Sequence, residues 1–185
     1  MSDDLAWRLG ARLPGHDYRV FKTSFVEATN PRTGAPKRFS LIESVNWVNV
    51  IALTTDDRVV LVRQYRAGSS SVCLEIPGGM IDGDEQPIAA GARELVEETG
   101  YTGGTYELIG DVSPNPAIQT NRLYTVLAKN VVLTHELDLD DGEHIAVETA
   151  TLAEVQAKIV SGEIDHALVV AAFGHLALRH GVMRA

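Results

Sequence analysis

The chain has 185 residues, of which 45% are apolar, so it can bury a substantial core and is expected to form one domain. Its formal net charge of -9 argues against non-specific binding to nucleic acid or anionic membranes, because both need clustered lysine and arginine. The single cysteine, Cys73, excludes an intramolecular disulfide and a cysteine-rich zinc site and favours the cytoplasm. We find neither a signal-peptide core nor an apolar run of membrane-spanning length.

The first third of the sequence predicts strands. Residues 1–15 show little pattern and are expected to form a loose or docking arm. Residues 18–27 and 38–48 are strand-like, and the turn cluster NPRTGAP between them predicts a small antiparallel sheet. The stretch WVNVIALTTDDRVVLVRQYR then predicts a hairpin of the main sheet, with its turn at residues 54–57.

A helix is predicted at residues 87–99, because proline suits the first helical position and Gly100 suits a left-handed C-terminal cap. The remaining elements alternate without an internal repeat or a flexible linker. Strands are predicted at residues 106–111, 122–128 and 145–151, and helices at 152–161 and 164–179.

The helix at residues 87–99 has two unlike faces at about 100° per residue. One face is predicted to be core and comprises Ile88, Ala92, Leu95, Val96 and Thr99. The opposite face carries Glu94, Glu97 and Glu98, and the small residues Ala90 and Gly91 are expected to leave it open.

Acids at these spacings repel one another by about 0.2–0.5 kcal/mol per pair and oppose the helix dipole. A solvated surface would tolerate that repulsion. The acids, however, belong to a longer pattern that runs from Gly79 through Glu85 and Arg93 to Gly100. Oxygen-rich clusters of this kind suit hard divalent cations, which bridge carboxylates to phosphates.

This pattern resembles the signature of the Nudix hydrolases, G-x5-E-x7-R-E-U-x-E-E-x-G-U, in which U is usually aliphatic. Every fixed position is present between Gly79 and Gly100, and the one departure is the aromatic Tyr101 at the last position. The resemblance implies an α/β fold, in which an α/β/α sandwich surrounds a mixed sheet and a small antiparallel sheet precedes it. It divides the chain into an N-terminal region, 1–48, for dimerisation and a Nudix domain, 49–185.

The same resemblance implies a Mg²⁺ site, with Mn²⁺ as the alternative metal. Glu94 and Glu98 would be the principal ligands, with Glu97 close by and the carbonyl oxygen of Gly78 as a further ligand. Arg93 would pair with Glu85 and brace the helix against the preceding loop.

A general base is needed to take a proton from the attacking water. Two sources remain open: Glu97 in the helix, or an acid of the stretch HELDLDDGEHIAV at residues 135–147. A solvated loop is the plain interpretation of that stretch. It nevertheless resembles the acidic loop of Nudix enzymes that cleave ADP-ribose and nucleotide sugars, in which case Glu143 is the first choice, as base or metal ligand, and Asp141 the second.

The lead-in VVLVRQYR…LEIPGGMIDGDE is also similar to that subgroup, in which an arginine at the position of Arg66 reaches the phosphates. Glu75 would orient an arginine or a metal-bound water, or pair on the sheet. Trp47 would stack on a base or lie in the core. The subgroup commonly forms homodimers through its N-terminal sheet.

The substrate is the least constrained prediction. Pro116 lies where ADP-ribose hydrolases carry a proline, but the surrounding SPNPAIQTNR departs from their pattern. Its polar residues Asn115, Gln119 and Arg122 are candidates for contacts with a phosphate or a sugar hydroxyl.

The predicted function is Mg²⁺-dependent hydrolysis of ADP-ribose or a related nucleoside diphosphate sugar to a nucleoside monophosphate and a sugar phosphate. The substrate is thus a small nucleotide, with neither nucleic acid nor membrane as partner. The alternatives are a non-catalytic Nudix-fold sensor that regulates a partner, which the intact acids disfavour, and a hydrolase of nucleoside triphosphates.

Overall fold

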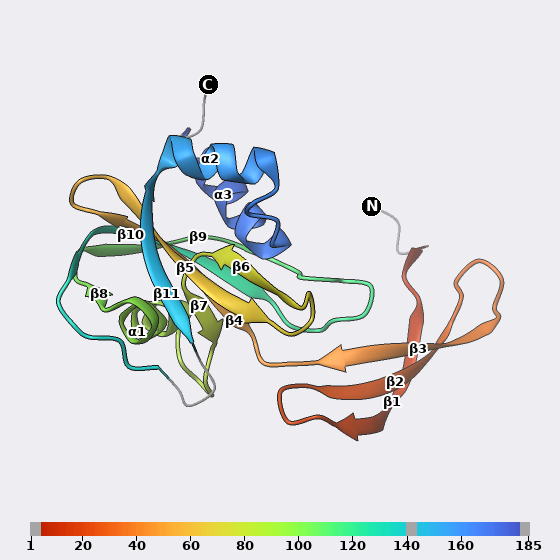
Figure 1. Ribbon diagram of the computed structural model, residues 1–185. Helices are drawn as coiled ribbons and strands as arrows, with labels where there is room; N and C mark the ends of the chain where they lie inside the picture. The colour runs from red at the N-terminus through yellow and green to blue at the C-terminus, as the bar shows by residue number, and fades with distance from the viewer. Residues whose placement is uncertain (1–4, 140–143, 182–185) are drawn as a thin grey trace. The chain divides into compact units, whose positions relative to one another are not determined.

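The computed structural model describes residues 5–139 and 144–181 (Figure 1). The chain divides into two compact units. The first comprises Met1–Val45 and Ser113–Arg122, and the second comprises Asn46–Val112 and Leu123–Ala185.

The first unit contains an antiparallel sheet in the order β1-β2-β3, formed by Arg8–Asp17, Lys22–Thr29 and Pro36–Glu43. Residues 1–15 were expected to form a loose or docking arm; the loose alternative is wrong from Arg8 onward, because β1 begins there and pairs with β2. Glycine and proline in β1 hid the strand in the sequence. Every residue of β1 is exposed. Glycine and proline are tolerated in this edge strand, because one row of its backbone groups faces solvent.

A distant segment completes the first unit. Within Ser113–Arg122, the backbone at Ile118 and Thr120 pairs with Ile42 of β3: Ile42 donates to the Ile118 carbonyl oxygen over 2.7 Å, and Thr120 donates to the Ile42 carbonyl oxygen over 3.1 Å. The sequence did not indicate this association, since the partners lie far apart along the chain.

The second unit is built on a mixed sheet. Its path is β11-β5-β4-β10-β8, with β6 paired to β5, β7 to β4 and β9 to β10. The strands are β4 Trp47–Thr54, β5 Arg58–Arg66, β6 Ser71–Glu75, β7 Gly78–Met80, β8 Tyr101–Thr102, β9 Thr105–Val112, β10 Leu123–Leu133 and β11 Ile145–Thr151. β10 runs parallel to β4, whereas the other pairs are antiparallel. β4 and β5 form the hairpin that was predicted for the main sheet, with its turn between Thr54 and Arg58.

The described residues of this unit form three helices: α1 Pro87–Thr99, α2 Leu152–Ser161 and α3 Ala167–His180. α1 ends as predicted, because Gly100 adopts a φ of 72° and its N–H bonds to the Val96 carbonyl oxygen. α2 also has the predicted bounds, and Thr151 begins it with a capping box to Glu154. α3 starts later than predicted. None of these helices is both long and apolar enough to span a bilayer.

Two apolar cores lie on opposite faces of the mixed sheet. Alternate residues of β4 divide between them: Val48 and Val50 face the cluster that includes Leu95 of α1, whereas Ile51 faces the cluster that includes Phe173 of α3. Figure 1 shows α1 on one side of the sheet and α2 with α3 on the other. The predicted α/β/α sandwich around a mixed sheet is therefore confirmed.

Candidate active site

The buried face of α1 differs from the one predicted. Ala90, Gly91 and Leu95 lie against the sheet, whereas Ile88, expected in the core, is 40% exposed. Gly91 allows the close approach, because a Cβ there would lie 3.0 Å from Cγ2 of Val50. The small residues therefore serve packing, and the expectation that they leave the acidic face open is wrong.

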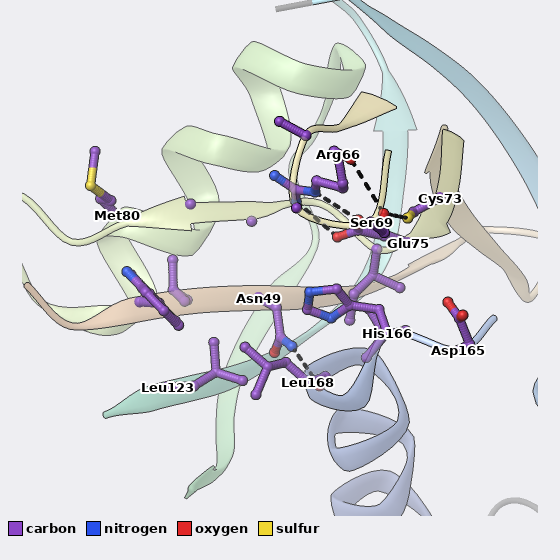
Figure 2. Close-up of a pocket in the computed structure, with 18 residues that line it drawn as sticks. Asn49, Arg66, Ser69, Cys73, Glu75, Met80, Leu123, Asp165, His166 and Leu168 are labelled. Atoms are coloured by element: carbon purple, nitrogen blue, oxygen red, sulfur yellow. Dashed lines mark hydrogen bonds and ion pairs between the residues drawn. The ribbon is translucent and has the colours of Figure 1, made fainter. Parts of the chain in front are cut away.

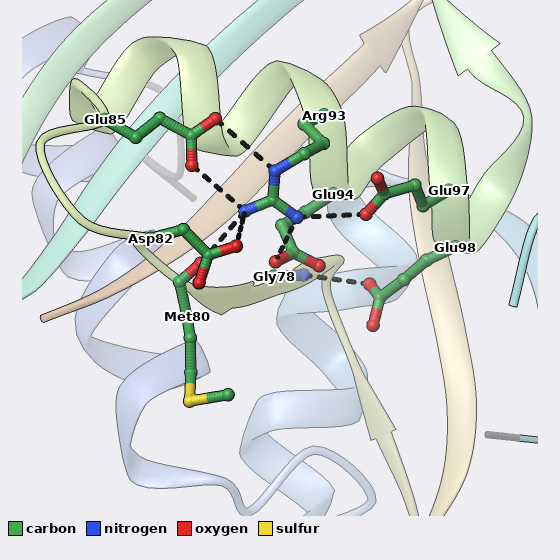
Figure 3. A network of polar contacts seen from close by, with 8 residues as sticks. All are labelled: Gly78, Met80, Asp82, Glu85, Arg93, Glu94, Glu97 and Glu98. Carbon is green, nitrogen blue, oxygen red and sulfur yellow. Dashed lines mark hydrogen bonds and ion pairs between the residues drawn. The ribbon is translucent and has the colours of Figure 1, made fainter. Parts of the chain in front are cut away.

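Arg93 explains how the acids of α1 are tolerated. Its Nη1 donates to Glu94 Oε1 over 2.9 Å and to Glu97 Oε2 over 3.0 Å, as Figure 3 shows. Its Nη2 donates to Glu85 Oε2 over 3.1 Å and to the Met80 carbonyl oxygen over 3.0 Å. The pair with Glu85 that the resemblance implies is thus present, and it lowers the pKa of Glu85 below its ordinary value. One guanidinium offsets the repulsion between several carboxylates and ties α1 to the loop before it.

Two carboxylates of α1 lie close to the two glycines of β7, Glu98 beside Gly78 and Glu94 beside Gly79. Glu98 is only 4% exposed, and its Oε2 accepts a hydrogen bond of 2.9 Å from the Gly78 N–H. Glu94 lies against Gly79, where a Cβ would come within 2.6 Å of the carboxyl carbon. The structure thus brings together Gly78, Glu94 and Glu98, three of the four residues predicted as metal ligands, and it gives Gly79 a steric reason to be glycine.

Arg66 and Glu75 form a second charged pair. Nε and Nη2 of Arg66 donate to Oε1 and Oε2 of Glu75, and both distances are 2.8 Å. Glu75 is only 3% exposed, so its carboxylate depends on this two-pronged pairing. The same bonds raise the pKa of Arg66. Of the roles considered for Glu75, the structure shows the orientation of an arginine.

A cavity of about 650 Å³ lies beside these residues. Arg66, Glu75, Gly78 and Gly79 contribute to its wall (Figure 2). Three apolar side chains from neighbouring strands line it as well, because β4 pairs Trp47 with Met80 on one side and with Leu123 on the other. Trp47 is half-buried at the cavity rather than enclosed in the core.

The cavity also includes residues that the sequence analysis missed: Asn49, Asp165, His166 and Leu168. Asn49 had left a signal, since it is a polar residue in the middle of an apolar strand. The others lie at the beginning of α3, and nothing local in the sequence links them to the Nudix signature.

The remaining predicted substrate-binding residues do not line this cavity. Asn115, Gln119 and Arg122 belong to the first unit, where Asn115 Oδ1 accepts from the Ala117 N–H and Arg122 Nη1 donates to Ser113 Oγ over 2.5 Å. Their contacts with substrate stay a prediction. Glu143 and Asp141 lie outside the described residues.

The acids of α1 can be tested against the needs of a metal ion. Within residues 5–139 and 144–181, no three histidine, cysteine, aspartate or glutamate side chains gather closely enough to hold one. Mg²⁺ usually needs fewer, because it keeps several waters and binds one or two carboxylates together with substrate phosphates. Glu94 and Glu98, one helical turn apart and close to Gly79 and Gly78, supply such a pair of hard oxygen ligands, so the donor set fits.

Comparisons with known proteins agree with the family that the signature indicates. The NUDIX domain model matches residues 45–173. An ADP-ribose pyrophosphatase of Bacillus subtilis is 27% identical over 159 residues, which cover 85% of this chain and 86% of that protein. A methanol dehydrogenase activator of Bacillus methanolicus is 28% identical over 165 residues, or 89% of each chain.

A solved structure, described as a crystal structure of ADP compounds hydrolase, shares the fold. Its TM-score is 0.84 at 22% identity, and the match covers 100% of both chains. The family model spans most of the chain, and the signature residues Glu85, Arg93 and Glu94 are joined by hydrogen bonds. The chain therefore belongs to the Nudix family and is a Nudix hydrolase.

Proposed function

We propose that this protein hydrolyses the diphosphate linkage of ADP-ribose or a related nucleoside diphosphate sugar, with Mg²⁺, to a nucleoside monophosphate and a sugar phosphate. The observation that carries the proposal is the pair Glu94 and Glu98 beside Gly78 and Gly79, two glycines that line a cavity together with Arg66. Relatives named as ADP-ribose pyrophosphatases support the choice of substrate class.

The acids of α1 would hold the metal. In this proposal Glu94, Glu98 and the Gly78 carbonyl oxygen bind Mg²⁺, and Mn²⁺ is the alternative. Bound metal supplies positive charge against the phosphate oxygens and favours ionisation of a water. Arg93 keeps the carboxylates of Glu94 and Glu97 in place, since its Nη1 donates to both.

Arg66 would bind the diphosphate. Its bonds to Glu75 use Nε and Nη2, so Nη1 remains directed away from that carboxylate. A guanidinium held in this way loses little side-chain entropy when it binds phosphate. The proposed general base is Glu97 or Glu143. Asn115, Gln119 and Arg122 are proposed to contact the substrate.

We also propose that the protein is a homodimer that uses its N-terminal sheet. Leu9 and Leu13 of the edge strand β1 are 67% and 43% exposed, and an edge strand with apolar side chains is a surface on which a second copy can pair. The free cysteine is consistent with a cytoplasmic protein.

A product analysis tests the activity. Pure protein is incubated with Mg²⁺ and ADP-ribose, GDP-mannose, UDP-glucose, dinucleotides or nucleoside triphosphates, and the products are identified. Release of AMP from ADP-ribose, or of a nucleoside monophosphate from a nucleotide sugar, is the expected result. Preferential triphosphate hydrolysis would contradict the substrate class.

A regulatory role is the second candidate. It is favoured by the similarity to the methanol dehydrogenase activator, which extends over 89% of both chains. A protein of this kind would still carry a Nudix site, so the product analysis separates the two: turnover of none of the panel, together with binding of a nucleotide, would favour the regulator.

A further inference from the structure

Asn49 presents a buried hydrogen-bond acceptor to the cavity. The side chain lies on β4 and is only 6% exposed, and its Nδ2 donates to the carbonyl oxygen of Leu168 over 3.1 Å (Figure 2). The reverse amide orientation would place Oδ1 against that carbonyl oxygen, so the observed orientation is fixed. Oδ1 is fully buried and has no partner among the residues that the structure describes. Leaving a buried acceptor unsatisfied is unfavourable, and a ligand donor would remove that cost.

His166 adds a second polar atom to the same cavity. It immediately precedes α3, but its side chain does not cap that helix. Its Nδ1 is buried, again without a partner in the described part of the chain, and Figure 2 shows the imidazole beside Asn49. Depending on its tautomer, Nδ1 can donate or accept.

The chemistry of these atoms selects a neutral donor. An ionised phosphate oxygen carries no hydrogen and can only accept, so it cannot satisfy Asn49 Oδ1, and the carboxylate of Asp165 in the same wall would repel it. A hydroxyl fits both atoms, because it can donate to Asn49 Oδ1 while it accepts from an Nδ1–H of His166. Trp47, Met80 and Leu123 form an apolar wall in the same cavity, against which the flat face of a ring can pack.

We propose that Asn49 and His166 form a specificity subsite for a sugar hydroxyl of the substrate. The inference rests on the proposed function for the identity of the ligand, but not on catalysis. The hydroxyl can belong to the nucleoside ribose or to the sugar on the second phosphate. Asn49 makes the discriminating contact, because its acceptor has a fixed orientation.

Binding measurements without turnover test the subsite. Dissociation constants are measured by calorimetry in the presence of EDTA for three ligands: ADP-ribose, the methyl ester of ADP, which lacks the second sugar, and a 2′,3′-dideoxyadenosine analogue of ADP-ribose, which lacks the nucleoside hydroxyls. The wild type is expected to bind ADP-ribose about tenfold more tightly than one of the two analogues, the effect of one hydrogen bond. That analogue identifies the sugar concerned.

Two variants connect this preference to the residues. Asn49→Leu is expected to weaken ADP-ribose binding about tenfold and to leave the affinity for the identified analogue unchanged. Because this variant also loses the bond to Leu168, His166→Phe serves as the second, since it keeps that bond. His166→Phe is also expected to weaken the binding of ADP-ribose more than the binding of the identified analogue. His135→Phe, at an exposed position, is the matched control.

Three results would overturn the subsite: equal losses for all ligands in both variants, unchanged affinities, or no binding of any ligand to the wild type. Unchanged affinities would show that the ligand makes no hydrogen bond to Asn49 or His166. Turnover with Mg²⁺ is measured separately. Selective binding without turnover would contradict the proposed function alone, and turnover without selectivity would contradict the subsite alone.

Discussion

The carboxylate of Glu75 accepts two hydrogen bonds from the guanidinium of Arg66, and both N–O distances are 2.8 Å. Glu75 is buried whereas the side chain of Arg66 remains 43% exposed, so the acid acts as a fixed anchor and the arginine as the part that a ligand can reach. If Arg66 binds the diphosphate as proposed, its geometry as well as its charge should determine that binding.

Arg66→Lys is therefore expected to impair the enzyme although it keeps the charge. Lysine cannot make the two parallel bonds, so Glu75 loses a partner and the cation loses its position. We expect a fall in kcat/KM of about 10- to 100-fold, which corresponds to roughly 1.4–2.7 kcal/mol of lost transition-state stabilisation. Steady-state kinetics with ADP-ribose measures it. Arg58→Lys, on the same strand but outside the cavity, is the control and should be near normal.

Glu98→Gln separates metal binding from folding. Glutamine keeps an oxygen that can accept the Gly78 N–H, so the unfolding temperature should stay close to that of the wild type. The negative charge is lost, and kcat should fall by a factor of about 10² or more if the carboxylate holds the metal. The exposed Glu107→Gln is the matched change on β9. A Glu98→Gln enzyme with a nearly normal rate would refute the metal assignment.

Gly91 should not accept a branched side chain. Gly91→Val would force atoms into the contact between α1 and the side chains of Val48 and Val50, and overpacking of this kind costs about 1–3 kcal/mol. Denaturant unfolding measures the loss. Ala89→Val, at an exposed position of the same helix, controls for the poorer helix propensity of valine. Equal stability of the two variants would show that the helix does not press on the sheet at Gly91.

The Arg93–Glu85 pair should make stability depend on pH. Hydrogen bonding to Arg93 depresses the pKa of Glu85 in the folded protein below its ordinary value of 4.5. A depressed pKa contributes stability that is present above the unfolded value and is lost as the pH falls through the folded value. The wild type should thus exceed Glu85→Gln in unfolding temperature at pH 7, and the difference should shrink below about pH 4.5. A difference that stays constant down to pH 3 would contradict this linkage.

Short-range sequence signals were sufficient to predict where α1 ends and where α2 begins. Gly100 ends α1 and Thr151 begins α2 because each residue satisfies backbone groups next to it in the chain. Arg93 could be paired with Glu85 from the family signature alone. By contrast, β1 was missed because its glycines and proline weaken the local pattern of a strand, while pairing with β2 makes it one.

Only the tertiary structure decided what each face of these elements contacts. Helical periodicity grouped Ile88 with Leu95. In the structure the sheet instead covers the face of α1 that contains Gly91, where the helix backbone comes close to the side chains of β4. Likewise, Asn49 and His166 are remote in the sequence and meet only because α3 packs on the face of β4 that carries Asn49. Caps and periodicity depend on neighbours within a few residues, whereas a cavity depends on which distant surfaces pack together, and that is settled by the folding of the whole unit.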